Sequence, residues 1–480
     1  MLLYEHLADD FSSLIANGQI RPGERLPSVR HLAQQRNLSV STVLQALRTL
    51  ESKGLIEARP QSGFYVRGRG MRLVQGSSHD EVKPAVEVGL SGNLMKVLHQ
   101  NESAGMAPFG SAIPAPQLLL APKLNTLYSR IARTQPKLLA KSSHGHVNED
   151  KLVRALMRRY LEWGTHLHSD EIIITNSCTE AMMLCLRAVT REGDTVAVES
   201  PTYYLMLQLL EAMGLKALEI PTHPSTGISV AALELATRNN AVAACLLIPN
   251  GSNPLGCVAS DDNKRAIAKL LAQRNIPLIE DDLYGDICHS KQSNTSANNS
   301  ANGHPRPIYS FDESGNTMLC SSFSKTVSPG LRLGFVAGGK RAADVLFQKT
   351  VNSGNTNAIT QNVLAELIES RGFDLHLRSL RRKLSDQIAR TRDAVERHFP
   401  TETRITDPQG GFVLWIELPE GINTMNTHAL AVKEKIAFVP GALFSPSGNY
   451  SNFLRLACGH PWSPQLDDAV KRLGAIVGKQ

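Results

Sequence analysis

Residues 321–335 read SSFSKTVSPGLRLGF and place Lys325 among serines, seven residues ahead of Arg332. A lysine that forms a Schiff base must lose its proton part of the time, which cationic or buried surroundings favour. A phosphorylated ligand needs hydroxyl and arginine donors close together, and Ser322, Ser324 and Arg332 can supply them. On its own, such a segment is more typical of an ordinary surface loop. Whether Lys325 belongs to a ligand site therefore depends on whether other residues of the chain could bind the same ligand.

The bulk composition is that of a globular protein of two or three domains, with 480 residues, 42% hydrophobic and 20% charged. No apolar run is long enough for a membrane span, and the acidic start MLLYEHLADD does not resemble an export signal. The seven cysteines include no CxxC pair, so we expect no disulfide framework or metal site, and a cytoplasmic protein. The net charge of +7 permits a polyanionic partner without requiring one.

The N-terminal residues predict three short helices and a hairpin. Apolar residues recur at helical spacing over 3–16, Ser28 can cap a second helix, and Ser39 or Ser41 a third that stops at Gly54. The segments LIEA and GFYV then read as two β-strands joined by a turn. Together these elements predict a winged helix-turn-helix.

A helix-turn-helix lays its second helix in the major groove of DNA, while flanking groups hold phosphates. The candidate DNA contacts are Arg30, Ser39, Ser41, Thr42, Arg59, Gln61 and Gly63. The serines can also be helix caps only, and the arginines a solvated face. Residues 1–66 resemble the GntR-type winged helix, through the motifs LPSVR, SxxTVxxAL, LxxxGLI and SGFYV. Many relatives carry basic residues where this chain has Val40 and Leu44, so we expect no bidentate guanine contact from those positions.

The rest of the chain alternates β segments with helical ones. Gly, Ser and mixed charges over 69–92 predict a linker between a DNA-binding domain (1–68) and a large domain (93–480). The segments EIIIT, DTVAVE, AACLLIP, IPLIED and MLCSS predict a mainly parallel sheet covered by helices. A smaller α+β subdomain is expected over about 360–480, and the polar tract 289–307 reads as an exposed insertion.

Polar residues follow these β segments in order. Asp281, at the end of IPLIED, can pair with a protonated pyridine nitrogen, and Tyr284 or Asn253 can reach a phenolic oxygen on the same ring. Tyr203 offers a stacking ring and Arg455 a clamp for a carboxylate. At the strand-to-helix junction NSCTEAM, the amides of Cys178 and Thr179 can bind phosphate.

This ordered set resembles the fold-type I pyridoxal-phosphate enzymes, the aspartate aminotransferase superfamily, over roughly residues 90–480. The resemblance implies that Lys325 binds the cofactor covalently, with Arg455 as the clamp for a substrate or effector carboxylate. The other implied cofactor contacts are Asp281, Tyr284, Asn253, Tyr203, Ser322, Ser324, Arg332, Cys178 and Thr179. One departure is Ser177, where relatives usually have glycine, which matters only if that turn needs a positive φ.

The fusion of the two parts resembles the MocR subfamily of GntR-type bacterial transcriptional regulators. The resemblance implies a regulator that holds pyridoxal 5'-phosphate and senses a small amino compound or a B6 vitamer. It also implies a domain-swapped homodimer on double-stranded DNA with two half-sites. The alternative is an active aminotransferase with an accessory DNA-binding module, because the chain keeps every catalytic group. An empty large domain is disfavoured, since Lys325, Asp281 and Arg332 are all present.

Overall fold

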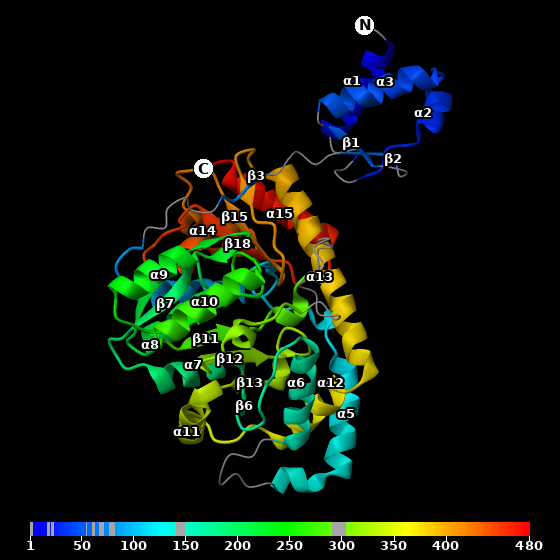
Figure 1. Cartoon of the computed structure of the whole chain (residues 1–480). Coiled ribbons are helices and arrows are strands. Elements are labelled where there is room, and N and C mark those ends of the chain that lie inside the picture. The colour runs from blue at the N-terminus through cyan, green and yellow to red at the C-terminus, as the bar shows by residue number, and fades with distance from the viewer. Residues whose placement is uncertain are drawn as a thin grey trace.

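The structure is a computed structural model of the whole chain. It describes residues 3–16, 20, 24–53, 55–59, 63–66, 72–75, 82–140, 149–289 and 304–480. Gln61 and Gly54 therefore lie outside the described residues, as do parts of the predicted linker and most of the predicted insertion. Figure 1 shows an N-terminal module set apart from a larger α/β body.

The N-terminal module is the predicted winged helix-turn-helix. Ser28 caps the second helix by accepting a hydrogen bond from His31 N (3.3 Å), and that helix ends at Asn37 in the left-handed conformation. Ser39 caps the third helix by accepting from Thr42 N (3.1 Å). Apolar residues of all three helices and the hairpin share one core. The elements are α1 (Leu3–Ala16), α2 (Val29–Arg36), α3 (Val40–Ser52), β1 (Ile56–Arg59) and β2 (Gly63–Val66).

A nine-stranded sheet forms the centre of the large domain within the described residues. In sheet order its strands are β4 (Val86–Glu87), β8 (Lys216–His223), β7 (Thr195–Ser200), β10 (Val242–Leu247), β11 (Leu278–Asp281), β12 (Thr317–Ser322), β13 (Gly334–Ala337) and β6 (Ile172–Thr175), with β9 (Gly227–Ile228) beside β8. The central strands β8, β7, β10, β11 and β12 run parallel. β13 is antiparallel to both of its neighbours, β12 and β6, so β6 runs in the same direction as the central strands. The mainly parallel sheet is thus confirmed.

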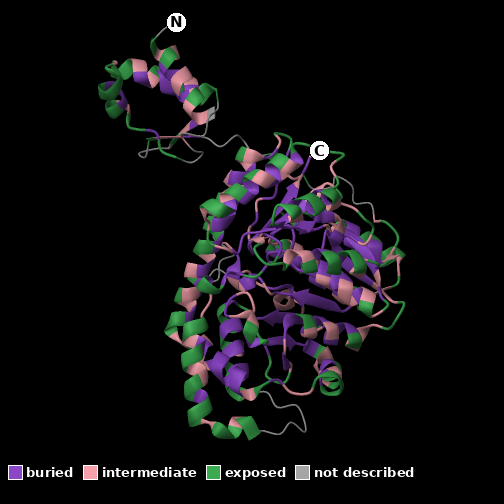
Figure 2. Ribbon diagram, turned by 180° about the vertical axis from the view of Figure 1, so that it is seen from behind, coloured by how far each residue is buried: buried purple, intermediate pink, exposed green. Residues whose placement is uncertain are grey.

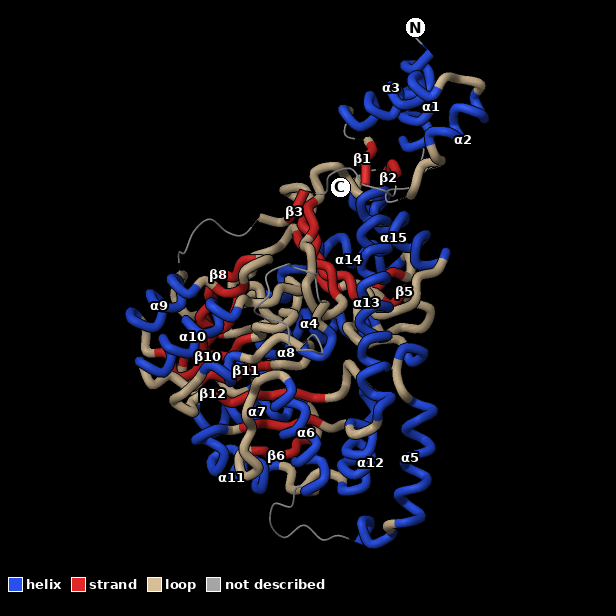
Figure 3. The backbone as a smooth tube through the Cα atoms, turned by 45° about the vertical axis from the view of Figure 1, so that its right-hand side comes forward, coloured by secondary structure: helices blue, strands red, loops and turns tan. Residues whose placement is uncertain are grey.

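Helices cover both faces of this sheet (Figures 1 and 3). They are α5 (Ala121–Thr134), α6 (Asp150–Glu162), α7 (Cys178–Val189), α8 (Tyr204–Ala212), α9 (Val230–Asn239), α10 (Asp261–Gln273), α11 (Ala342–Asn352) and α12 (Ala358–Ile368). The helix α4 (Ser91–Asn101) packs instead in a separate core with Trp415 and Val439. Alternate strand residues point to opposite cores: Ile173 joins the core under α7, α8 and α11, and Ile172 and Ile174 join the core under α5, α6 and α12. In Figure 2 the strands are buried and the helices expose their outer sides.

The C-terminal subdomain packs helices on a five-stranded sheet of order β17-β18-β15-β14-β3. Its elements are α13 (Arg371–His398), β14 (Arg404–Ile405), β15 (Val413–Glu417), α14 (Thr424–Lys433), β16 (Ile436–Ala437), β17 (Val439–Pro440), β18 (Phe453–Ala457) and α15 (Pro464–Val477). The long helix α13 leads into it from the large sheet domain (Figure 1). The short 3-10 helices of the chain are η1 (Pro116–Leu118), η2 (Pro136–Ala140), η3 (Gly285–Ile287), η4 (Ile308–Phe311), η5 (Pro329–Leu331), η6 (Gly339–Arg341) and η7 (Gly441–Phe444).

Three short strands from early in the chain join these later sheets. β3 (Arg72–Leu73) pairs with β14, and β4 pairs with β8, so parts of the predicted linker belong to the large domain's sheets. β5 (Ala107–Pro108) pairs with β16 in the C-terminal subdomain. Two-residue edge strands are held by backbone hydrogen bonds rather than by a hydrophobic pattern, and the sequence therefore carries no periodic signal for them.

Candidate functional site

The carboxyl ends of the parallel strands bring the predicted cofactor residues to one edge of the sheet. Asp281 is the last residue of β11, Ser322 is the last residue of β12, and Asn253 follows β10. All three side chains are buried. The helix α7 packs against β11, β12 and β13, and its N-terminus begins at Cys178. The strand order alone therefore assembles residues that are far apart in the sequence.

Lys325 lies just after β12, and its Nζ donates to the carbonyl oxygen of Ala112 at 2.7 Å. The residue as a whole keeps intermediate exposure, but its ammonium end is enclosed. The pKa of Lys325 is lowered to about 8, first by burial and then by the positive charge of Arg455, against the opposing effect of Asp281. A neutral amine, the nucleophilic form, is thus accessible near physiological pH.

Asp281 faces the same space. Its Oδ1 accepts hydrogen bonds from Leu283 N (3.0 Å) and from the Cys178 thiol (3.3 Å). Burial raises the pKa of Asp281 to about 6, although both hydrogen bonds act to lower it. Because burial disfavours the ionised carboxylate, a cationic group that lies against Asp281 would stabilise it.

The buried amide of Asn253 has no hydrogen-bond partner on either its nitrogen or its oxygen within the described part of the chain. Tyr284 is buried nearby, and burial raises the pKa of the Tyr284 phenol against the opposing positive charge of Arg455. Tyr203 occupies the N-cap position of α8, and its ring centre lies 4.6 Å from that of Tyr204. Buried polar atoms are almost always satisfied, so the amide of Asn253 indicates a ligand position.

A turn rich in amide and hydroxyl donors surrounds the start of α7. Ser177 adopts φ −175°, which is extended backbone open to any residue, so the serine in place of glycine causes no strain. Ser322 Oγ lies 3.3 Å from Ser324 Oγ. Cys178 and Thr179 form the N-terminus of the helix, where the helix dipole favours an anion. A Cβ on Gly334 would meet backbone atoms of Ser177 and Cys178 at 2.7–2.9 Å, so this crossing requires glycine.

Arg332 does not contact these donors. Its side chain is exposed and its backbone is left-handed at φ 47°, in the turn before β13. It forms no hydrogen bond or ion pair through its side chain among the described residues, so its phosphate role stays a prediction.

Arg455, on β18, is fully buried. One of its terminal nitrogens donates to the carbonyl oxygen of Gly110, and its Nε and Nη1 have no partner among the described residues. Its guanidinium carbon lies 5.8 Å from the ring centres of Tyr204 and Phe444. A buried arginine with two unmatched donors fits a carboxylate, which would accept both hydrogen bonds.

Residues 107–115 have no role in the sequence-based prediction, yet Gly110 and Ala112 contact Arg455 and Lys325 through their carbonyl oxygens. The same segment is tied to the C-terminal subdomain by the β5–β16 pair and by a hydrogen bond from Ala457 N to Phe109 O (2.8 Å). A backbone carbonyl has no residue-type signature, so no pattern in the sequence indicates this contact.

A second missed feature is the ion pair that anchors α7. Lys349, which is 1% exposed, lies 3.1 Å from Glu180 Oε1. Glu180 in turn accepts hydrogen bonds from the backbone and side chain of Asn176. The pair fixes the turn that precedes the helix N-terminus. The signal available in the sequence was Glu180 itself, three residues after the capping Ser177.

On the DNA side, Arg30 is exposed in the first turn of α2, and Ser41 is exposed at the start of α3. Ser39 Oγ lies 2.8 Å from both Ser41 Oγ and Thr42 Oγ1, so these hydroxyls form one cluster around the cap. Val40, next to them, is 48% exposed. These DNA contacts remain predictions, because no DNA is present.

A further basic residue, Arg25, lies against the wing from the segment that precedes α2. Gly63 has φ +106°, and the Nε of Arg25 would lie 3.3 Å from a Cβ at this position. Arg25 forms a bridge with Tyr65 and so adds a third strand segment to the hairpin. Arg59 is the last residue of β1. Arg25 has no predicted role because it lies in a turn segment without periodicity.

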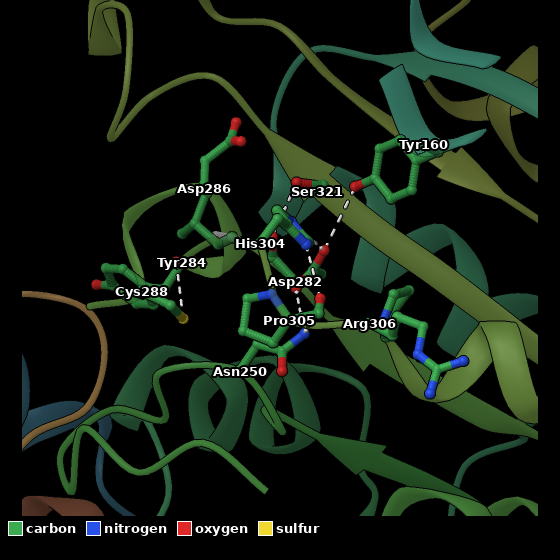
Figure 4. A network of polar contacts seen from close by, with 12 residues as sticks. Tyr160, Asn250, Asp282, Tyr284, Asp286, Cys288, His304, Pro305, Arg306 and Ser321 are labelled. Carbon is green, nitrogen blue, oxygen red and sulfur yellow. Dashed lines mark hydrogen bonds and ion pairs between the residues drawn. The ribbon is translucent and has the colours of Figure 1, made fainter. Parts of the chain in front are cut away.

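Close to the strand ends lies a buried polar network (Figure 4). Asp282 accepts hydrogen bonds from Asn250 Nδ2 (2.9 Å) and Tyr160 OH (3.4 Å), and its Oδ2 lies 3.2 Å from His304 Nε2. Lys264 donates to Asn250 Oδ1 at 2.6 Å. The network therefore ties together the neighbours of the predicted cofactor contacts, since Asp282 adjoins Asp281 in the chain and Asn250 is three residues from Asn253.

We expect Asp282→Asn to destabilise the large domain. The amide would replace one of the two acceptor oxygens by a donor, facing either Asn250 or the pair Tyr160 and His304. The loss of a buried charged acceptor costs about 3 kcal/mol. In a domain of this size that lowers Tm by roughly 3–5 °C in a thermal melt. Asp262→Asn is the control, because the Asp262 side chain is 95% exposed and the change should leave Tm nearly unaltered. Equal Tm values for both variants would contradict the structural role of the network.

Pyridoxal phosphate fits these residues on several independent observations. Asn253 has unsatisfied amide atoms, Arg455 has unsatisfied donors, and the pKa of Lys325 is depressed. Asp281 supplies a buried carboxylate for a ring cation, and α7 supplies a helix N-terminus for a phosphate.

Comparison with known proteins matches both parts of the chain. Residues 3–66 match the model of bacterial regulatory proteins of the gntR family, and residues 127–473 match that of aminotransferase class I and II. The structure resembles that of LysN, the α-aminoadipate aminotransferase of Thermus thermophilus, with a TM-score of 0.70 and 24% identity over 82% of this chain and 99% of that one. A DNA-binding domain of the gntR family fused to a domain with the aminotransferase fold defines a class of transcriptional regulators.

Full-length relatives share this arrangement. The HTH-type transcriptional regulator YjiR of Escherichia coli K12 is 36% identical over 99% of both chains. YdcR of the same organism, also named an HTH-type transcriptional regulator, is 34% identical over 99% of both chains. The chain therefore belongs to the MocR subfamily of GntR-type regulators. None of the described helices is both long and apolar enough to span a bilayer.

Proposed function

We propose that this chain is a pyridoxal-phosphate-dependent transcriptional regulator that senses a small amino compound or a B6 vitamer. The observation that carries the proposal is the buried, unsatisfied Asn253 amide at the same sheet edge as Asp281 and Lys325, in a chain that also has an intact winged helix. The relatives named as transcriptional regulators support the regulatory role. A cytoplasmic location accords with a DNA-binding role.

Each strand-end residue has a place in holding the cofactor. When bound, pyridoxal phosphate supplies an electrophilic carbonyl carbon and an electron-withdrawing ring that reacts with primary amines. Lys325 would bind that carbon, and Asp281 would pair with the pyridine nitrogen. The remaining contacts would be Asn253 and Tyr284 to the phenolic oxygen, Tyr203 to the ring face, and Ser322, Ser324, Arg332 and the Cys178–Thr179 amides to the phosphate.

An effector would act through the contacts of Lys325 and Arg455. A primary amine competes with Lys325, and a carboxylate takes up the unmatched donors of Arg455. Both cations rest on carbonyls of residues 110–112, a segment hydrogen-bonded to the C-terminal subdomain. Ligand binding would therefore shift the population of subdomain positions. A domain-swapped homodimer would carry this change to two reading heads on an operator with two half-sites.

The direct test is a titration of the purified full-length protein with candidate amino acids and B6 vitamers. The absorption band of the bound cofactor, near ~420 nm, and operator binding in a gel shift are followed together. A ligand that changes both at the same concentration supports the proposal. A colourless protein, or a spectrum that responds while DNA binding never does, would exclude a cofactor-based sensor.

The second candidate function is a working aminotransferase, which the retained lysine, aspartate and arginine favour. Steady-state assays with an amino donor and a keto-acid acceptor discriminate between the two. Turnover near ~1–10 s⁻¹ is ordinary for enzymes and would favour catalysis as the main role. Turnover several orders of magnitude slower would favour sensing.

Arg30→Ala is expected to weaken operator binding about tenfold and to reduce the salt dependence of binding by about one ion, because a phosphate contact is lost. The loss should be similar for specific and nonspecific duplexes. Arg36→Ala is the matched control on the same helix, since Arg36 is already paired with Asp10 at 3.3 Å. A gel-shift titration at two or more salt concentrations measures both. Unchanged binding by the Arg30 variant would remove Arg30 from the interface.

A further inference from the structure

A second hollow lies on the long helix α13, outside the set of residues around Lys325. Its volume is about 250 Å³, and the described residues that line it are His289, Arg378, Arg381, Arg382 and Ser385. These described lining residues include three arginines and no carboxylate. No pattern in the sequence predicted a role for these residues.

The helix itself sets the spacing of the cationic row. Residues 378, 381, 382 and 385 are separated by three or four positions and share one face of α13. An adjoining face of the helix is fixed by the fully buried Leu377, Leu380 and Leu384. Arg381 is further oriented by a hydrogen bond from its Nε to the carbonyl oxygen of Leu377 (3.3 Å). The three arginines therefore project from a helix that is held in place by its buried leucines.

The carboxylates nearest in sequence are engaged by other arginines. Asp286 and Asp374 lie 2.8 Å and 3.0 Å from the two terminal nitrogens of Arg159. Asp386 pairs with Arg390 at 2.9 Å. In the described part of the chain no ion pair joins Arg378 or Arg382 to a carboxylate. The sequence of residues 290–303, which follows His289, contains no Asp or Glu.

Like charges are crowded at this place. Burial lowers the pKa of Arg381, and the negative charge of Asp286 acts to raise it. The positive charges of Arg159 and Arg378 lower this pKa further. An anion bound beside Arg381 would relieve both the burial cost and the repulsion. Arg378 and Arg382 therefore bring positive charge to the hollow that no ion pair balances within the described part of the chain.

We propose that this hollow is a binding site for a small phosphate monoester. Arginine forks match the oxygens of a phosphate group, and a dianion balances the charges of Arg378 and Arg382. The volume is below the roughly 300–1,000 Å³ of pockets for drug-sized ligands, which favours a phosphate group with only a few further atoms. The Ser385 hydroxyl adds a neutral donor.

The site would be coupled to the cofactor residues by the chain itself. His289 lies at the end of the segment that starts with Asp281, and its Nε2 meets the carbonyl oxygen of Gly411 at 3.0 Å. Its backbone nitrogen donates to Gln409 O at 2.7 Å. A ligand against His289 and α13 would thus contact both the segment that carries Asp281 and the helix that leads into the C-terminal subdomain.

The experiment is equilibrium dialysis of full-length, cofactor-loaded protein with radiolabelled inorganic phosphate at constant ionic strength in chloride. Loading fills the proposed phosphate position near α7, so that only a further site is counted. We expect one saturable equivalent per chain, and at least about tenfold weaker binding in Arg382→Gln and Arg381→Gln, because each loses a charge-assisted hydrogen bond. Arg390→Gln, on the same helix but outside the hollow, should bind like the wild type.

Arg382 is exposed, so its variant tests the proposal even if Arg381→Gln fails to fold. Absence of saturable binding, or equal loss in Arg390→Gln, would overturn the proposal. So would phosphate binding that is lost in Arg332→Gln but kept in the α13 variants, which would place the phosphate at the cofactor. Displacement by a short nonspecific DNA duplex, with no selectivity for phosphate over chloride, would instead assign the arginines to a DNA backbone. A protein without cofactor would refute the proposed function and leave this site testable.

Discussion

Lys325→Ala should abolish the absorption band near ~420 nm and leave the protein unable to respond to any amino effector. Lys325 is the amine whose pKa is lowered to about 8, and its Nζ lies among the predicted cofactor contacts. Without it, the cofactor can be held only through noncovalent contacts, and the amine for which an effector competes is missing. The expected effect is complete loss of the band rather than a shift.

Absorption spectra of the purified variants, recorded with added pyridoxal phosphate and after removal of unbound cofactor, measure this loss. Lys340→Ala is the matched control, because Lys340 is an exposed lysine near the end of β13. It should keep the full band. Thermal melts of both variants show whether the fold is retained. A band that persists in Lys325→Ala would assign the covalent role to another lysine.

Arg455→Gln should reduce the affinity for amino-acid effectors about 100-fold while the absorption band persists, since a carboxylate that meets two charged donors away from water gains about 2–4 kcal/mol. The guanidinium is fully buried, and its Nε and Nη1 lack partners within the described residues. Glutamine cannot replace that charge. The substitution also removes the positive charge that helps to lower the pKa of Lys325, so this pKa should rise.

The measurement is a spectral titration with an amino acid and, in parallel, with the corresponding amine that lacks the carboxylate. Only the amino acid should lose affinity. Arg404→Gln is the control in the same subdomain, since Arg404 pairs with Glu417 on the neighbouring strand. If amine and amino acid weaken equally, Arg455 has a general structural role and the carboxylate clamp is wrong.

The sequence predicts those parts of the molecule that local patterns encode. The winged helix and the mainly parallel sheet follow from helical spacing, caps and short apolar runs, and the strand ends then carry Asn253, Asp281 and Ser322 to one edge. The motif alone does not say whether Ser177, where relatives usually have glycine, strains the turn. The backbone angle φ of Ser177 shows that it does not.

Contacts made by side chains with distant backbone could not be predicted in this way. The carbonyls of Gly110 and Ala112 have no residue-type signal, and the partners of Asp282 come from three separate segments of the chain. The pairing of β3 and β4 with later strands depends on where the chain passes, not on its periodicity. Secondary structure could thus be predicted from the sequence, whereas contacts between distant segments could not.

The shared support of Lys325 and Arg455 on residues 110–112 has a consequence for how such a sensor diversifies. Substitutions in this segment alter neither the groups that recognise a ligand nor the surface that reads DNA. In the sensor proposed above, they would change the balance between the resting and occupied states, and so the concentration at which the response is half complete. Such a sensor would have a threshold that selection can adjust independently of what is recognised and of which genes are controlled.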